Sequence, residues 1–67
     1  TLSRILSDPN EHVMVRHEAA EALGAIGNPI AVDILRKHLT DVNPEVSESC
    51  EVALDLLDWV RKSSVPE

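Results

Sequence analysis

Residues 15–26 read VRHEAAEALGAI, and this stretch decides the fold. Its apolar side chains recur at intervals of three and four residues, which is the spacing of one face of an α-helix. We expect this helix to span residues 13–26, with a core stripe made of Val15, Ala19, Ala22, Leu23 and Ile26. Because no stretch alternates apolar and polar residues as a half-buried strand does, the sequence predicts an all-α fold.

Three more helical segments flank this helix, at residues 1–7, 29–40 and 44–62. Two of them begin with the same signal, since Asn28 precedes Pro29 and Asn43 precedes Pro44. Asparagine caps a helix through its side-chain oxygen, and proline suits the first helical position, where its missing N–H has no intrahelical partner anyway. The first segment stops before Pro9, which cannot donate a helical hydrogen bond, and looks like the end of a longer helix.

The segments repeat along the chain. Residues 6–8 (LSD) match residues 39–41 (LTD) at an offset of 33, and apolar positions in residues 15–23 match those in 46–54 at an offset of 31. A period of about thirty residues made of two helices is typical of an α-solenoid. A free-standing three-helix bundle would contain the same helices but would not explain the repeat. We therefore expect a HEAT-like α-solenoid fragment of about two helix pairs.

In this interpretation the whole chain, residues 1–67, is one HEAT-like repeat fragment. Residues 1–26 hold the end of one outer helix and an inner helix, and residues 29–62 form a terminal capping repeat. The inner helices, which line the concave surface where repeat proteins bind their ligands, are residues 13–26 and 44–62.

Composition limits the function classes. A chain of 67 residues makes at most one small domain. Its single cysteine, Cys50, cannot close an intramolecular disulfide, which favours a reducing, cytoplasmic location. The net charge of −6 would repel a phosphate backbone, so no nucleic acid partner is expected. No apolar run approaches the roughly 18 residues of a membrane span, so no membrane partner is expected either. The acidic surface is a solvated face or a weak preference for a cationic partner.

His17 is the first candidate for chemistry. At about 100° per residue it lies roughly 180° from the centre of its helix's core stripe, which would place it on the concave wall. The small residues Ala20 and Gly24 lie on the same side, and we expect them to leave room for something to approach the backbone. A neutral imidazole and carboxylates such as those of Glu18 and Glu21 are suitable ligands for iron or zinc.

A purely structural interpretation of the same residues is also open, in which His17 is an exposed histidine paired with Glu21 one turn away. One histidine and two glutamates are too few for a closed metal site. The zinc-protease pattern would need a second histidine at position 21, where a glutamate stands. The residues alone therefore do not decide between a metal ligand and a solvated pair.

The other reactive side chains carry weaker signals. We expect His12 in an exposed loop, His38 as a partly buried packing residue and Cys50 as an inert apolar residue of the core. Ser47 and Ser49 have no general base positioned to activate them. None of these residues is expected to form a catalytic site.

Residues 15–26, together with residues 48–55 (ESCEVALD), resemble the last two repeats of the deoxyhypusine hydroxylase family. The resemblance implies a HEAT-like solenoid of two halves, in which His-Glu pairs on inner helices hold two iron ions that activate oxygen. The implied activity is an iron-dependent monooxygenase that hydroxylates a deoxyhypusine side chain on the eukaryotic translation initiation factor that carries hypusine. By this resemblance His17 and Glu18 are ligands to one iron ion, and a fragment with a single such pair is expected to be inactive alone.

The second repeat departs from the family pattern. At the offset of 31, Glu48 takes the place of His17 and Ser49 takes the place of Glu18, so the last repeat lacks a metal pair and is expected to act as a cap. The alternative function, from a different class, is a non-catalytic HEAT-like scaffold whose concave face binds a protein.

Exposed apolar residues lead to a last expectation. Val52, Leu56 and Trp59 form a second apolar row on the last helix, which either packs on residues beyond this chain or mediates self-association. A partial solenoid also exposes an apolar end where preceding repeats belong, so the fragment is expected to associate with itself.

Overall fold

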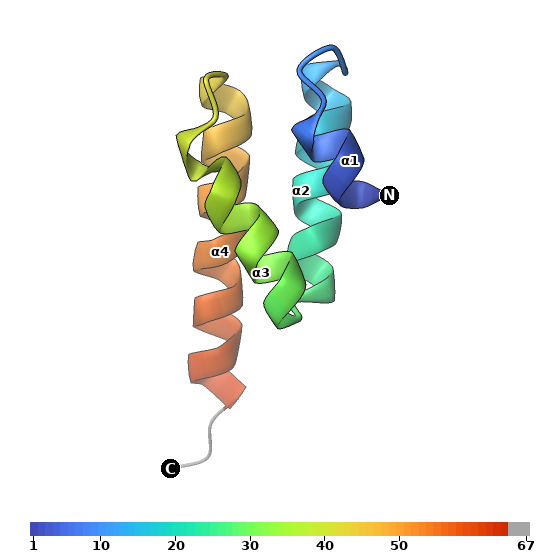
Figure 1. Ribbon diagram of the computed structural model, residues 1–67. Coiled ribbons are helices and arrows are strands. Elements are labelled where there is room, and N and C mark those ends of the chain that lie inside the picture. The colour runs from blue at the N-terminus through green and yellow to red at the C-terminus, as the bar shows by residue number, and fades with distance from the viewer. Residues whose placement is uncertain (65–67) are drawn as a thin grey trace.

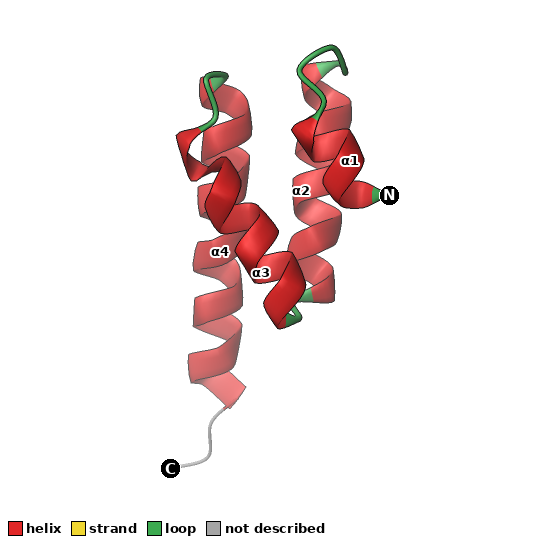
Figure 2. Cartoon of the chain, viewed as in Figure 1, coloured by secondary structure: helices red, strands yellow, loops and turns green. Residues whose placement is uncertain are grey.

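The computed structural model describes residues 1–64. Every regular element in that range is helical, so the all-α prediction is confirmed (Figure 2). The elements are α1 (Leu2–Ser7), α2 (Val13–Ile26), α3 (Pro29–Lys37), the short 3-10 helix η1 (His38–Thr40) and α4 (Pro44–Ser64). None of these helices is both long and apolar enough to cross a membrane.

The helices form two layers (Figure 1). α1 and α3 lie in the front layer, and α2 and α4 run side by side behind them in the same direction, with α3 returning the chain from the end of α2 to the start of α4. The most extensive interface joins α2 to α4. This is the stack of two helix pairs expected of a HEAT-like fragment, in which α1 and α3 are equivalent and α2 and α4 are equivalent.

Local signals set the helix ends. The side-chain oxygen of Asn28 accepts a hydrogen bond of 2.8 Å from the Ala31 N–H, and that of Asn43 accepts one of 3.0 Å from the Glu45 N–H, as predicted. α2 ends at Gly27, whose φ of 63° lies in the left-handed region that glycine adopts without strain. α3 stops at Lys37 and tightens into η1, so the predicted helix 29–40 is α-helical only to residue 37.

The core lies between the two layers. It contains mainly alanine and leucine, with Cys50 among the fully buried residues as predicted. Alanine is frequent because helices can approach closely only where side chains are small. The buried apolar residues are Leu6, Ala19, Ala20, Leu23, Ala31, Leu35, Val46, Cys50 and Ala53.

The predicted core stripe of α2 is partly wrong. Val15 is 37% exposed and Ile26 54% exposed, whereas Ala20, which was expected to face away from the core, is fully buried. The prediction assumed that α2 has one partner, but α2 packs both on the front layer and on α4. Its buried arc is therefore wider than one stripe and extends to the side that carries Ala20.

The exposed part of that stripe has a counterpart in α4. At the offset of 31, the exposed Val15 and the half-buried Ala22 of α2 correspond to Val46 and Ala53, which are both buried in α4. The surface that α4 turns toward α2 is therefore the same surface that α2 leaves open. A preceding helix pair could stack on α2 just as α2 stacks on α4.

Arg16 joins the two helix pairs from within. Its side chain is 6% exposed; Nε donates a hydrogen bond of 2.8 Å to the Leu6 carbonyl, and Nη2 lies 2.6 Å from Oδ2 of Asp41. Burial opposes ionisation of Asp41, but the N–H of Asn43, the guanidinium of Arg16 and the charge on His38 outweigh it and lower the pKa of that carboxyl. A buried ion pair thus fixes the segment that leads into α4.

Candidate metal centre

His17 lies in the second turn of α2 and faces α4. Its Nδ1 is 2.5 Å from the Ser49 Oγ, and its Nε2 contacts the Glu21 carboxylate one turn further along α2. The side chain is 40% exposed, so the ring is held between two partners yet stays open to solvent. The structure therefore brings together His17, Glu21 and Ser49.

Glu18 is not part of this contact. It is exposed, and it follows His17 by one residue, so its side chain leaves the helix about 100° away from the imidazole. The carboxylate that meets the ring is that of Glu21, because residues four apart lie on the same helical face.

The expectation that Ala20 and Gly24 leave room beside His17 is wrong for Ala20, whereas Gly24 lines a groove together with His17 although it is closed toward α4. Ala20 is fully buried, and a Cβ atom added at Gly24 would lie only 3.1 Å from the Cβ of Ala53. Gly24 is small where α4 approaches α2 closely. The space near His17 lies instead along the surface between the two helices.

A groove of about 480 Å³ follows that surface. Its polar residues are His17, Glu21 and Ser49, and apolar residues such as Val52, Leu56 and Val60 line it further along α4. Val52, Leu56 and Trp59 are all exposed, as the predicted second apolar row requires. The full lining is His17, Glu21, Gly24, Ala25, Ser49, Val52, Ala53, Leu56, Leu57 and Val60.

The prediction that no base lies near Ser49 is also wrong, because the His17 ring is within hydrogen-bonding distance. This contact does not make Ser49 a nucleophile. Its hydroxyl donates a hydrogen bond of 2.7 Å to the Glu45 carbonyl, and the residue sits inside α4, where the backbone N–H groups of an oxyanion hole would already be bound. The serine instead supports the imidazole.

The donor chemistry fits a metal such as iron, but only in part. An imidazole nitrogen and glutamate oxygens suit iron, and di-iron proteins build their centres from His and Glu side chains on facing helices. Over residues 1–64, no three His, Cys, Asp or Glu side chains are grouped so that they could hold an ion. Residues 1–64 alone therefore do not form a closed metal site.

The remaining candidates take structural places. His12 is exposed, as predicted, and its Nδ1 accepts the Met14 N–H at the start of α2. His38 is half-buried, as predicted, and binds the Ile34 carbonyl and the Ser7 hydroxyl. Burial, together with the charge of Asp41, raises the pKa of the Cys50 thiol to about 11, so this thiol is unreactive at neutral pH.

Comparison with known proteins decides the family. A family model described as HEAT repeats matches residues 1–55. The chain belongs to the HEAT-repeat family. HEAT repeats are pairs of helices that stack into a solenoid, which agrees with the two helix pairs of this fold.

The similarity to deoxyhypusine hydroxylase predicted from the sequence is confirmed. The chain is 50% identical over 60 residues to deoxyhypusine hydroxylase of Danio rerio, covering 90% of this HEAT-repeat chain and 20% of the relative. It is 47% identical over 66 residues to deoxyhypusine hydroxylase-B of Oryza sativa subsp. japonica, covering 98% of the chain and 22% of the relative. The chain thus spans about one fifth of the length of these relatives.

The fold agrees with the same family. The structure of human deoxyhypusine hydroxylase in complex with glycerol superimposes with a TM-score of 0.81 and 48% identity, over 87% of this chain and 20% of that one. These HEAT repeats are therefore similar to part of that enzyme in both sequence and backbone.

Proposed function

We propose that this chain is part of a deoxyhypusine hydroxylase, an iron-dependent monooxygenase that hydroxylates deoxyhypusine to hypusine on a eukaryotic translation initiation factor. The observation that carries the proposal is the identity of 47–50% to enzymes of that name over at least nine tenths of the chain. Identity of this size, with the same backbone, supports the same role for the same positions. The proposed location is the cytoplasm, where a free buried thiol such as that of Cys50 stays reduced.

We further propose that His17 and Glu18 are ligands to one iron ion of a di-iron centre. His17 is suited to this role because its side chain is 40% exposed and lines the groove, and a cation can replace the contact of Nε2 with the exposed Glu21 carboxylate. Glu18 is exposed and does not line the groove, so as a ligand its side chain would have to reach around α2 to the ion held by His17. When bound, iron supplies the activation of oxygen that the hydroxylation needs.

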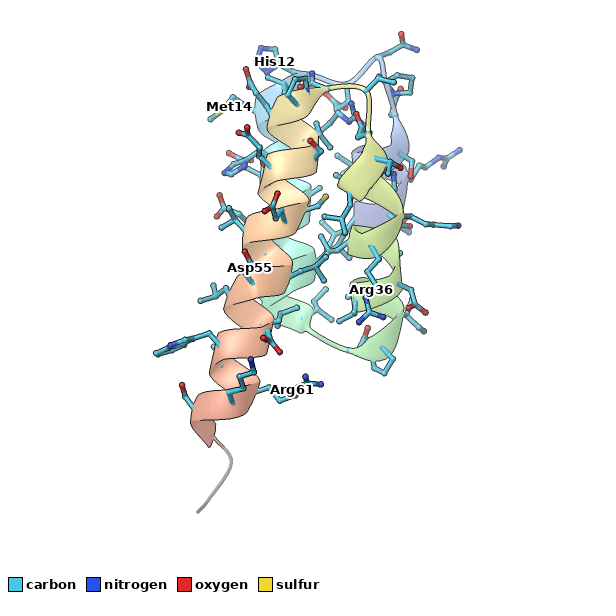
Figure 3. All side chains as sticks on the ribbon, turned by 90° about the vertical axis from the view of Figure 1, so that its left-hand side faces the viewer. His12, Met14, Arg36, Asp55 and Arg61 are labelled. Atoms are coloured by element: carbon cyan, nitrogen blue, oxygen red, sulfur yellow. The ribbon has the colours of Figure 1, made fainter. Side chains whose placement is uncertain are left out.

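The second helix pair is proposed as the terminal cap of the solenoid. Gly24 allows α2 to meet α4 closely, and at the offset of 31 its counterpart in α4 is Asp55. Figure 3 views the molecule from the α4 side and shows Asp55 on the surface of α4 that is turned away from α2. A further inner helix could pack closely on α4 only if this position held a small residue. The carboxylate of Asp55 therefore disfavours another repeat, which is how capping repeats end a solenoid.

A chain with one His-Glu pair is expected to be inactive alone. A di-iron centre needs ligands from several helices, and residues 1–64 offer no group of three ligands. The 67-residue chain is therefore expected to show neither hydroxylation nor tight one-to-one iron binding, and robust hydroxylation by this chain alone would contradict the proposal.

Substitutions in the longer protein test the ligand assignment. His17→Ala and Glu18→Ala are each expected to lower bound iron and hydroxylation of the deoxyhypusine-containing factor at least tenfold. Glu21→Ala is the matched control, because it removes the carboxylate that contacts His17 without removing a proposed ligand. Unchanged iron content and activity in the first two variants would favour the alternative, a non-catalytic scaffold that binds a protein.

A further inference from the structure

Ser49 and His17 face each other across the two inner helices. The distance between Ser49 Oγ and His17 Nδ1 is 2.5 Å, although the residues are 32 positions apart. The same serine oxygen is 2.7 Å from the carbonyl of Glu45, one turn earlier in α4. One hydroxyl therefore touches both a ring nitrogen and a backbone oxygen.

The proton count of these groups assigns the direction of each hydrogen bond. A serine hydroxyl has one proton to donate and two lone pairs with which to accept, whereas a carbonyl can only accept. The proton of Ser49 is directed to the Glu45 carbonyl. The oxygen of Ser49 then accepts a hydrogen bond from the His17 ring, so Nδ1 carries a proton.

We propose that Ser49 is a positioning residue for His17: it holds Nδ1 in the protonated form and so leaves Nε2 as the nitrogen that binds a metal ion. A histidine ligand typically donates its second ring N–H to a fixed oxygen, which sets both the tautomer and the ring orientation. Here that oxygen comes from the next repeat, so the proposed cap orients a ligand of the preceding helix pair. The metal-binding part of this inference rests on the proposed function, whereas the tautomer does not.

Glu21 offers a competing arrangement. The Glu21 carboxylate only accepts, so Nε2 keeps its contact with Glu21 only while it carries a proton. In a doubly protonated ring Nδ1 still donates to Ser49. In a neutral ring protonated at Nε2 alone, Ser49 would have to turn its own proton from Glu45 to Nδ1. The Glu21 side chain is 65% exposed, so water competes for its contact with the ring. Ser49 is half-buried and is held on its helix by the Glu45 bond, so it is the more constant partner. The two neutral arrangements differ in which ring nitrogen is protonated, and in the proposed one the exposed Glu21 carboxylate turns away from the unprotonated Nε2. This difference can be measured.

Two substitutions and one control isolate the serine. Ser49→Ala removes the acceptor and keeps α4 helical, because alanine is the best helix former. Ser49→Thr restores a hydroxyl at the same place. Ser47→Ala is the matched control, since the Ser47 hydroxyl also bonds a carbonyl of α4, that of Pro44, but does not contact His17.

Nitrogen-15 NMR of the histidine-labelled chain reads the tautomer directly, because protonated and unprotonated ring nitrogens resonate in separate ranges. In alkaline buffer, in which imidazole side chains are neutral, the proposal predicts a protonated Nδ1 and an unprotonated Nε2 for His17. Ser49→Ala is expected to shift the proton toward Nε2, Ser49→Thr to retain it on Nδ1, and Ser47→Ala to change nothing. A protonated Nε2 in the unsubstituted chain, or the same tautomer after Ser49→Ala, would overturn the proposal.

Iron affinity of the longer protein separates this inference from the proposed function. Loss of an outer hydrogen-bond partner typically weakens metal binding by about 10- to 100-fold, and that loss is expected for Ser49→Ala with rescue by Ser49→Thr. Iron bound equally well by the unsubstituted protein and by Ser49→Ala would overturn the role of the serine. If His17→Ala left iron binding unchanged, the proposed function would fail, while the tautomer result would still stand.

Discussion

Arg16 of α2 and Asp41 of the segment before α4 form an ion pair in which Nη2 and Oδ2 are 2.6 Å apart and both side chains are at most 10% exposed. The same guanidinium donates to the Leu6 carbonyl of α1. One side chain thereby ties both helices of the first pair to the segment that connects the two helices of the second pair. In the second pair, Ser47 takes the place of Arg16. The proposed cap therefore has no arginine at this position to form the same ion pair with a following repeat.

Removal of one partner of this pair is expected to destabilise the fold. Asp41→Asn leaves the Arg16 charge buried without compensation, and breaking such a pair costs about 3 kcal/mol. Urea unfolding followed by circular dichroism measures the loss. Asp58→Asn is the control, because Asp58 forms its ion pairs with Arg61 and Lys62 at the surface and its loss is expected to have little effect. Equal stability of both variants would show that the buried pair does not hold the repeats together.

The same pair gives the stability a pH dependence of defined sign. The pKa of Asp41 is lower in the folded chain than its ordinary value of 3.8, so the unfolded chain binds a proton at a higher pH than the folded chain. The contribution of Asp41 is therefore complete above about pH 4–5 and is lost as the pH falls through the lower folded pKa. Unfolding free energies measured from pH 6 down to pH 2 should fall less steeply for Asp41→Asn than for the unsubstituted chain. Parallel curves would contradict this assignment.

Gly24→Ala tests the close approach of α2 to α4. Alanine favours a helix by up to about 1 kcal/mol over glycine, but the new Cβ would lie 3.1 Å from the Cβ of Ala53. Overpacking of a core costs about 1–3 kcal/mol, so we expect a net loss of stability of about 1 kcal/mol. The reverse exchange, Gly24→Ala with Ala53→Gly, removes the clash and should be more stable than the sum of the single changes. A more stable single variant would mean that the helices separate easily.

Self-association is expected through the open side of α2. Val15 and Ile26 are exposed there, and at the offset of 31 their counterparts in α4 are the buried Val46 and the partly buried Leu57. Ile26→Lys should move the association seen in sedimentation experiments to higher concentration. Val42→Lys is the control, because Val42 is almost fully exposed outside the helices and lies at the opposite end of the stack. A monomer at high concentration in the unsubstituted chain would exclude this interface.

Much of the fold could be predicted because its signals are local or periodic. The caps at Asn28 and Asn43 depend only on the following residues, and both helices begin where the sequence indicates. The offset of 31 relates α2 to α4, so it predicts that these two helices share a layer without knowledge of any contact. These properties come from spacing along the chain, which a sequence displays directly.

The details of the site could not be predicted in the same way, because they depend on which face of each helix packs against its neighbour. Ala20 was interpreted as facing open space, whereas it is fully buried, and α4 approaches closely at Gly24. Ser49 was missed as the partner of His17, although the offset contains the signal: it places Ser49 at the height of Glu18, one residue from His17, on the neighbouring parallel helix. Periodicity gives the height of a residue along a helix but not the rotation of that helix against its partner.

The most direct test of the account is the position of iron relative to His17. In crystals of the longer protein, anomalous scattering at the iron edge should locate an ion bonded to Nε2 of His17, with Nδ1 still on the Ser49 hydroxyl and the Glu21 carboxylate displaced. Iron bound elsewhere, with Nε2 of His17 remaining on Glu21, would contradict the central claim that this imidazole is a metal ligand.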